Sequence, residues 1–544
     1  MSIFASDIRK TEMDFEQTTI PRAIIATCMK SNKAHQQALV LDDEHITYEE
    51  LLHRAKMLAY HLHITYNIKA GDIIGQCVER SINMIVGMLA IMLAGAVYCP
   101  LNPDDPIERL LTIIEDTHVQ IVLVHDSTKT KFSTQNTQLI TVNIQTQIDI
   151  DTYQHSLPYP SVQPHAVAYL IHTSGSTGKP KSVQLTHDNF LNALYGYHAS
   201  GVYCLRHDRV LQMAACSFDI HVMECLGPLV NGSTCVMLKH HGNLDLSYVL
   251  SIIKRHQVNV AFFVPSFLYA FHEYLERTNQ FHLLTSMRQI AFGGEACHPA
   301  RIATIFNSIS KPPLNIQLVN AYGPAETCVL ATSHVVTQQD IDQNLIRIGL
   351  PFPNYTCYIL DEHSSPVSAN KIGELYIGGR GVFAGYFGDD GRVQSLNKQM
   401  LVRLPFDNSL CYRTSRLLEN GEILYCGRVD HQVKLRGQHL EIGEIEACVM
   451  QMEGVRNCVV MKQTDVRNQQ DFLVAFVESN HEQVTNNLDK TILHQCRMKL
   501  PNYMAPSVVK VMDKLPLNAN GKIDRKQLPN MGLLEQTTSD SNNT

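Results

Sequence analysis

Several features that commonly indicate a function are missing from this 544-residue sequence. Its 15 cysteines include no Cys-x-x-Cys pair, so their spacing predicts no zinc site. The net charge is −7 and no basic stripe is present, which argues against a nucleic-acid partner. The first ten residues contain no apolar signal core. Together with the dispersed cysteines, this predicts reduced thiols and a cytoplasmic protein.

Long apolar runs are also scarce. The charge-free run at residues 84–101 could be mistaken for a membrane span, but it contains Gly87, Gly95 and Pro100. Because glycine and proline interrupt helices, we expect a buried helix over residues 84–93, a turn, and then a strand through Tyr98. No membrane partner is therefore predicted.

The sequence does contain an alternation of predicted strands and helices. Strands are expected at residues 72–77, 97–101 and 121–125, with helices at 80–93 and 107–115 between them. This order predicts an α/β domain with a parallel sheet, while residues 127–164 are polar and predicted to be rich in loops.

A change of pattern follows residue 430. Ile442, Ile445, Val449 and Met452 form one face of a predicted helix, and two strands and a second helix follow. This order predicts a small α+β domain. The predicted parts are a large N-terminal domain over residues 20–429, a small C-terminal domain over 430–530 and a disordered tail over 531–544.

The stretch 171–181 reads Ile-His-Thr-Ser-Gly-Ser-Thr-Gly-Lys-Pro-Lys and follows an apolar run that predicts a buried strand. Two glycines let several backbone N–H groups converge, and four hydroxyl residues and two lysines surround them, which suits a polyphosphate. It is not the usual P-loop, because Pro180 follows Gly178 and Lys179. On composition alone, a polar surface loop is the alternative.

By its pattern, Thr173–Lys181 closely resembles the phosphate loop of the adenylate-forming superfamily. That superfamily contains acyl-CoA synthetases, luciferases and the adenylation domains of nonribosomal peptide synthetases. Similar motifs occur at residues 93–103, 318–327, 373–381 and 517–522, and the resemblance covers roughly residues 20–528. It implies a large multi-sheet α/β domain joined to a small α+β lid by a hinge at Asp430.

The resemblance also implies a site for ATP and Mg²⁺. It assigns catalysis to Lys522 and Glu326, makes Glu326 the metal ligand and stacks Tyr322 on the adenine. Taken alone, Lys522 is an ordinary surface lysine and the motif around Glu326 is an ordinary Gly-Pro turn. The predicted nucleotide-binding residues are Thr173, Ser174, Gly175, Ser176, Thr177, Gly178, Lys179, Lys181, Gly294, Glu295, Asn320, Ala321, Tyr322, Gly323, Arg416 and Arg428.

An acidic residue is found where amino-acid-activating domains bind the α-ammonium group. Asp219 matches that position, although a helix N-cap is the alternative interpretation. The other residues at the specificity positions are apolar, which favours a hydrophobic or aromatic amino acid; on spacing alone they are ordinary core residues. The predicted substrate-binding residues are Asp219, Ile220, Met223, Phe263, Ala291, Gly293, Ala321, Val329 and Leu330.

Four positions near the nucleotide depart from the family pattern: Ser182, Ala325, Arg416 and His439. Arg416 stands where the family has the aspartate that binds the ribose. Loss of such a charge-assisted contact costs about 1.5–3 kcal/mol of ATP-binding free energy. Lys522, Glu326, Asp219 and the phosphate loop are intact.

The predicted function is therefore ATP-dependent activation of a hydrophobic amino acid as an acyl-adenylate, with release of pyrophosphate. No Gly-Gly-x-Ser motif follows Leu528, so we expect transfer to a phosphopantetheine thiol on a carrier protein in trans. Two alternatives stay open. One is an acyl- or aryl-CoA ligase, and the other is a catalytically weakened binding protein that keeps the fold.

Overall fold

The computed structural model describes residues 7–9, 13, 15, 17–30, 33–133, 140–144, 160–173, 180–368, 371–419, 424–428, 432–435, 438–465, 470–479, 487–516 and 525–531. The chain divides into two compact units. The first contains Met1–Pro103, Ile114–His172 and Ser182–Val429, and the second contains Asp104–Ile113, Thr173–Lys181 and Asp430–Thr544.

The first sheet of the large unit is mostly parallel. Four of its strand pairs, β4 with β5, β4 with β6, β5 with β8 and β6 with β7, run parallel. In spatial order the strands are β7 (Ile140–Asn143), β6 (Ile121–Val124), β4 (Ile73–Cys77), β5 (Val97–Pro100), β8 (Val167–Thr173) and β9 (Lys181–Thr186). The predicted phosphate loop therefore joins two neighbouring strands, β8 and β9.

The second sheet has nine strands, and its centre is parallel from β2 through β14. In spatial order they are β16 (Leu350–Pro351), β15 (Thr332–Val335), β14 (Gln317–Tyr322), β13 (Gln289–Gly293), β12 (Val260–Phe263), β10 (Arg209–Gln212), β11 (Thr234–Met237), β2 (Gln37–Leu41) and β3 (Glu44–Thr47). Parallel strands place their carboxyl ends on one edge, where α/β folds form binding sites.

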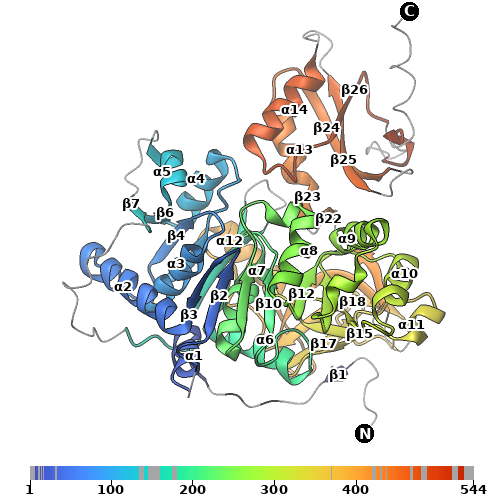
Figure 1. The fold of residues 1–544 in the computed structure, drawn as a ribbon. Coiled ribbons are helices and arrows are strands. Elements are labelled where there is room, and N and C mark those ends of the chain that lie inside the picture. Colours follow the sequence, from blue (N-terminus) through green and yellow to red (C-terminus); the bar gives the residue numbers. More distant parts are fainter. Residues whose placement is uncertain are drawn as a thin grey trace, which may run out of the picture. The chain divides into compact units, whose positions relative to one another are not determined.

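The third sheet of this unit is antiparallel. Its strands are β1 (Asp7–Arg9), β17 (Tyr355–Leu360), β18 (Ile372–Gly379), β20 (Leu410–Glu419), β19 (Leu401–Arg403) and β21 (Leu424–Arg428). The helices of the chain up to residue 400 are α1 (Ile20–Cys28), α2 (Tyr48–Tyr66), α3 (Ile82–Leu93), α4 (Ile107–Asp116), α5 (Asp126–Ser133), α6 (His187–Ala199), α7 (Asp219–Asn231), α8 (Leu246–Arg255), α9 (Pro265–Thr278), α10 (Pro299–Ile309), α11 (Gln338–Asp342) and α12 (Gly391–Met400). Figure 1 labels most of these elements.

The C-terminal part of the chain is smaller. Its elements are β22 (Gln432–Leu435), β23 (Gln438–Glu441), α13 (Ile442–Met450), β24 (Val455–Thr464), β25 (Asp471–Ser479), α14 (Leu488–Lys499) and β26 (Val508–Met512). Strands β24, β25 and β26 form one sheet, and the two helices pack on it through Ile445, Val449, Ile492 and Cys496.

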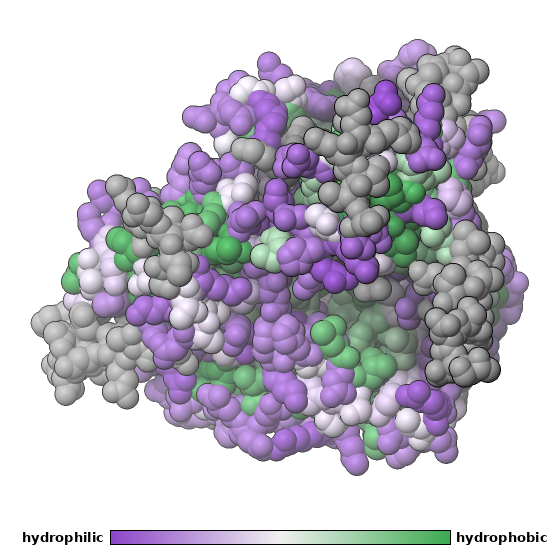
Figure 2. Space-filling model, turned by 90° about the horizontal axis from the view of Figure 1, so that it is seen from above, coloured by the Kyte–Doolittle hydropathy of each residue, from purple (hydrophilic) through white to green (hydrophobic). Residues whose placement is uncertain are grey.

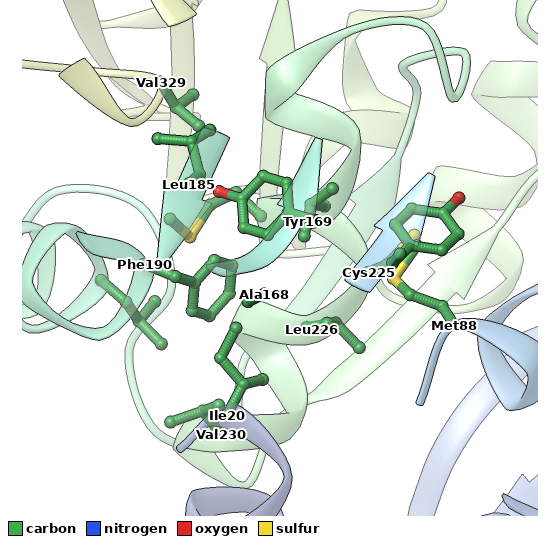
Figure 3. Close-up of a cluster of buried hydrophobic side chains, with 14 of the residues drawn as sticks. Ile20, Met88, Ala168, Tyr169, Leu185, Phe190, Cys225, Leu226, Val230 and Val329 are labelled. Carbon is green, nitrogen blue, oxygen red and sulfur yellow. The ribbon is translucent and has the colours of Figure 1, made fainter. Parts of the chain in front are cut away.

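The main core of the large unit surrounds α7. Residues 220–230 of this helix are all buried, so it contacts its neighbours on every side. Figure 3 shows Leu226 of α7 in the same cluster as Tyr169 of β8 and Phe190 of α6. The rings of Tyr169 and Phe190 meet edge to face with centroids 6.4 Å apart. Apolar side chains are thus gathered inside, and the face in Figure 2 is covered mainly by hydrophilic side chains.

Local sequence signals predicted many elements correctly. The run at residues 84–101 forms buried α3 and β5, as expected, and none of the helices that the structure describes combines the length and apolarity that a bilayer crossing needs. The pattern Thr-Tyr-Glu-Glu at residues 47–50 predicts a capping box, and Thr47 caps α2 with its reciprocal bonds. The prediction for residues 127–164 was incomplete, because α5 and β7 lie there.

Candidate active site

Asp219 is the first residue of α7, close to the partial positive charge of the helix N-terminus. The N-cap position belongs to Phe218, whose side chain makes no capping bond, so the structure does not support the N-cap interpretation of Asp219. Its Oδ1 accepts the N–H of Ile220 at 2.7 Å. Burial raises the pKa of Tyr169 and of Tyr197 well above 10, and the nearby charge of Asp219 adds to both shifts. The carboxylate therefore lies among buried phenols.

A short, strained segment carries two of the predicted specificity residues. Val329 has a φ of 75°, in the left-handed region that β-branched residues rarely adopt. The hydroxyl of Tyr197 accepts the N–H of Leu330 at 2.9 Å and lies 3.0 Å from the carbonyl oxygen of Cys328. The hydroxyl of Tyr169 lies 3.5 Å from the Cys328 sulfur. These two tyrosines fix the segment near Asp219, and the sequence analysis missed both.

The ends of three parallel strands supply further predicted residues. Gly293 at the end of β13 pairs in register with Ala321 of β14. A Cβ at Gly293 would lie 2.1 Å from the Ala321 carbonyl oxygen, so this approach requires glycine. Ala291 and Ala321 share one core cluster with Ile220, Met223, Val329 and Leu330. These six residues are thus part of the same large core, and their role in specificity stays a prediction.

Phe263 is the exception. Its ring belongs to the second core cluster, with its centroid 4.9 Å from that of Phe267 and 5.7 Å from that of Phe271. It ends β12 beside Phe292 of β13, so its backbone is at the expected edge. The structure places its side chain in an aromatic cluster outside the cluster of the other apolar specificity residues.

Two of the predicted nucleotide-binding residues make structural hydrogen bonds. The carboxylate of Glu295 accepts the N–H of Ser266 at 2.8 Å, in the first turn of α9. The amide of Asn320 donates to the Arg347 carbonyl oxygen at 2.7 Å. Gly294, between Gly293 and Glu295, has a φ of 86°. These bonds hold the turn after β13 and the end of β14 in place.

Glu326 lies in a 3-10 turn (Ala325–Thr327) just after β14, and 8% of its surface is exposed. Its Oε1 accepts a hydrogen bond from the Tyr386 hydroxyl at 2.7 Å. Within the described part of the chain, no other side chain hydrogen-bonds this carboxylate. Magnesium is commonly bound by one or two carboxylates together with phosphate oxygens. A carboxylate with one oxygen held and the other available fits such a role.

Ser182, one of the departures, directly follows the phosphate loop. Its hydroxyl lies 3.0 Å from Nδ1 of His172, the residue just before the loop. Nε2 of His172 lies 3.3 Å from the sulfur of Cys99 on β5. Burial raises the pKa of Cys99 to about 12, so the sulfur remains a thiol. The Ser182 side chain therefore joins the two ends of the loop.

Several predicted residues lie outside the described residues: Ser174, Gly175, Ser176, Thr177, Gly178, Lys179, Asp430 and Lys522. Thr173 ends β8 and Lys181 begins β9. Arg416 of β20 and Arg428 of β21 are directly opposite each other in the antiparallel register. The roles predicted for all these nucleotide-binding, hinge and catalytic residues stay predictions. The assignment of residues 20–429 and 430–530 to two functional domains also stays a prediction.

Comparison with known proteins identifies relatives. Residues 28–387 match the family model of the AMP-binding enzymes, and residues 444–522 match that of the AMP-binding enzyme C-terminal domain. The chain is 34% identical over 509 residues to gramicidin S synthase 2 of Brevibacillus brevis, covering 91% of this chain and 11% of that protein. It is also 34% identical over 502 residues to tyrocidine synthase 3 of Brevibacillus parabrevis, covering 90% and 7%. The chain thus spans only a small part of these relatives.

Solved structures share the fold. An artificially fused adenylation–PCP di-domain of a nonribosomal peptide synthetase from Klebsiella oxytoca superposes with a TM-score of 0.79 at 23% identity, covering 92% of this chain and 94% of the other. The o-succinylbenzoate CoA synthetase of Bacillus subtilis superposes with a TM-score of 0.78 at 21% identity, covering 94% and 98%. A mixed α/β large domain with a smaller C-terminal domain is common to them and to this chain.

Proposed function

Because this chain belongs to the AMP-binding enzyme family, and is therefore an ATP-dependent ligase that forms acyl-adenylates, we propose that its substrate is a hydrophobic amino acid. We further propose that the aminoacyl group passes to the phosphopantetheine thiol of a carrier protein supplied in trans. The names of the peptide synthase relatives support an amino acid as the substrate, and the adenylation–PCP structure supports a carrier domain as the acceptor.

The position of Asp219 carries this proposal. Asp219 is half-buried at the start of α7 with the buried phenols of Tyr169 and Tyr197 nearby, and the α-ammonium group of an amino acid is a favourable charge-assisted partner for a carboxylate in such a place. Ile220, Met223 and Leu330 belong to the same apolar core cluster, which favours an apolar side chain on the substrate. An acid without an amino group would not make this charge-assisted contact.

In the proposed reaction the substrate carboxylate attacks the α-phosphorus of ATP in line, and pyrophosphate leaves. The family resemblance assigns the contact with the carboxylate and the α-phosphate to Lys522, and the β- and γ-phosphates to residues 174–181. Glu326 would hold Mg²⁺, which would supply charge neutralisation. The residues of the chain act by positioning and by electrostatic stabilisation, since phosphoryl chemistry of this kind needs no protein nucleophile.

One finding favours the acyl-CoA ligase alternative, because a CoA synthetase is among the structural neighbours. The departures at Arg416 and Ala325 favour the weakened binding protein. The three hypotheses predict different substrates for pyrophosphate exchange: an amino acid, an acid without an amino group, or none. One exchange assay therefore distinguishes them.

The test is ATP–[³²P]pyrophosphate exchange with purified protein, Mg²⁺ and separate pools of amino acids and simple carboxylic acids. Exchange that depends on one hydrophobic amino acid is the expected result. Asp219→Asn should lower kcat/KM for that amino acid by roughly 10- to 150-fold, because a charge-assisted contact of about 1.5–3 kcal/mol is lost. Exchange with acids lacking an amino group alone would establish the ligase, and no exchange from folded protein would establish the binder.

Lys522→Ala should abolish adenylation while leaving ATP binding and thermal stability close to those of the unmodified protein. The reason is that Asn520 and Gly521 predict a tight turn that presents Lys522 to the reacting groups. Lys510→Ala is the matched control, because Lys510 is an exposed lysine of β26 in the same part of the chain. Equal exchange rates in the two variants would contradict the role given to Lys522.

A further inference from the structure

Tyr386 is a buried phenol that contacts the predicted metal ligand. It is 2% exposed, and its hydroxyl donates to Oε1 of Glu326 at 2.7 Å. A hydrogen bond of this length to a carboxylate is in the range of strong, charge-assisted bonds. Since an ionised carboxylate only accepts hydrogen bonds, the phenol is the donor in this pair.

The backbone of Tyr386 is held on both sides by one amide. Oδ1 of Asn397 on α12 accepts the Tyr386 N–H at 2.8 Å, and Nδ2 of Asn397 donates to the Tyr386 carbonyl oxygen at 3.3 Å. The ring stacks edge to face on Phe383, with centroids 4.9 Å apart. The N–H of Phe383 in turn donates to the carbonyl oxygen of Glu326 at 2.9 Å. Both the side chain and the backbone of Glu326 are thus tied to residues 383–386.

The same segment is bonded to the strand that follows the phosphate loop. Tyr386 forms an antiparallel bridge with Val183. On either side of it, the Gly385 carbonyl oxygen accepts the N–H of Gln184, and the Phe387 N–H donates to the Ser182 carbonyl oxygen. Residues 384–387 therefore connect β9, which begins at Lys181, to the Glu326 carboxylate.

We propose that Tyr386 is a positioning residue for the metal site, holding Oε1 of Glu326 so that the other oxygen is directed at Mg²⁺ bound with ATP. This inference rests on the proposed role of Glu326 as the metal ligand. Outer partners of this kind orient a ligand and typically change metal affinity 10- to 100-fold when they are removed.

The test is Tyr386→Phe, which removes the hydroxyl and keeps the ring packed on Phe383. Metal binding is measured without turnover, by electron paramagnetic resonance titration of Mn²⁺ in the presence of α,β-methylene-ATP. We expect Mn²⁺ affinity to fall at least 10-fold and the half-saturating Mg²⁺ concentration in the exchange assay to rise by a similar factor. The KM for the amino acid should stay within about 2-fold, which a general loss of folded structure would not produce.

Tyr358→Phe is the matched control. Tyr358 is also 2% exposed, and its hydroxyl donates to Oδ2 of Asp407 at 2.6 Å in the third sheet. Losing that bond should leave Mn²⁺ affinity unchanged. Asn397→Ala keeps the Tyr386 hydroxyl but removes its backbone support, and should weaken Mn²⁺ binding by a smaller factor in the same direction.

Glu326→Gln distinguishes the ligand role of Glu326 from the positioning role of Tyr386. If Glu326→Gln loses Mn²⁺ affinity and Tyr386→Phe does not, the positioning role of Tyr386 is wrong and the ligand role of Glu326 stands. If neither variant changes Mn²⁺ affinity, the ligand role of Glu326 is wrong and the inference is overturned with it. The assignments of Asp219 and Lys522 are tested separately by amino-acid-dependent exchange.

Discussion

Ser182 occupies a position at which the family resemblance predicts glycine, directly after Lys181. The structure gives its side chain a partner, because the hydroxyl lies 3.0 Å from Nδ1 of His172. His172 also contacts Cys99, a thiol buried on the neighbouring strand. A departure that looked unfavourable in the sequence is therefore part of a hydrogen-bonded chain at the base of the phosphate loop.

Ser182→Gly should lower the free energy of unfolding by about 1–3 kcal/mol, because the His172 ring loses a buried hydrogen-bond partner. His172→Phe should cost a similar amount. In the double variant the two losses should be less than additive, since both changes remove the same bond. Urea denaturation of the four proteins measures this coupling, and strictly additive losses would show that the two side chains do not interact.

Arg416 is another departure from the family pattern. It lies directly opposite Arg428 in the antiparallel register of β20 and β21. The family resemblance implies an aspartate at this position, which would bind the ribose. Arg416→Asp should therefore tighten ATP binding about 10-fold or more, from a contact of about 1.5–3 kcal/mol. Calorimetry with ATP measures the affinity, and Arg416→Ala, which lacks the new carboxylate, should show a smaller gain. An unchanged or weaker affinity in Arg416→Asp would refute the ribose argument.

Helix α7 shows how one buried element organises the site around Asp219. Oε2 of Glu224 accepts the N–H groups of Met213 and Ala214 at 2.9 and 2.8 Å, which fixes the start of the loop between β10 and α7. Arg80 donates to the side-chain and main-chain oxygens of Gln212 on β10. Oε1 of Glu224 has no hydrogen-bond partner among the described residues. The helix begins where this braced loop ends.

The same carboxyl makes a pH-dependent contribution to stability. Burial raises the pKa of Glu224 from 4.5 to about 7, although its backbone hydrogen bonds and Arg80 act in the opposite direction. Burial also lowers the pKa of the adjacent His221 to about 3, so that ring stays neutral. Between pH 4.5 and 7 the folded protein binds more protons at Glu224 than the unfolded chain. The contribution of Glu224 to the unfolding free energy is therefore complete below pH 4.5 and is lost as the pH rises through 7.

Glu224→Gln should remove that pH dependence. A shift of this size corresponds to a loss of about 3 kcal/mol between pH 4.5 and pH 8 in the unmodified protein. The measurement is the difference in urea unfolding free energy between the two proteins over this pH range. As the pH rises, the unfolding free energy of the Gln variant should increase relative to that of the unmodified protein. A difference that does not vary with pH would contradict the burial of a protonated Glu224.

Two compact units with separate cores make up the chain. The core clusters that contain Leu226 and Phe292 consist of residues before 413, whereas those that contain Ile445 and Phe476 consist of residues after 432. Since each cluster is built within its own part of the chain, the loss of one core does not require the loss of the other. Unfolding is thus expected to depart from two-state behaviour.

Differential scanning calorimetry of the full chain should show two transitions, with the larger enthalpy from the larger unit because enthalpy scales with the number of residues. MgATP should raise the midpoint of the larger transition, since ligand binding stabilises the state that binds it. A single transition whose calorimetric and van't Hoff enthalpies agree would show instead that the two cores unfold as one.

Much of the fold could be predicted because its signals are local. The capping box at Thr47 involves residues three positions apart, and the apolar runs of α3 and β5 are continuous in the sequence. The helix expected after Asp219 is α7. Helix α5 and strand β7 were missed because their sequences are short and polar, with little periodicity.

The sequence alone determined the α/β class, the small α+β part and the membership of the AMP-binding enzyme family, since these depend on local pattern and motif; it also proposed the residues for adenylate-forming chemistry. The partners of those residues were decided only by tertiary structure. Tyr197 reaches Leu330 across 133 positions, and Tyr386 reaches Glu326 across 60. Such contacts depend on which strands and helices meet in space, and the hydrophobic pattern of one element does not specify its neighbour's hydrogen bonds.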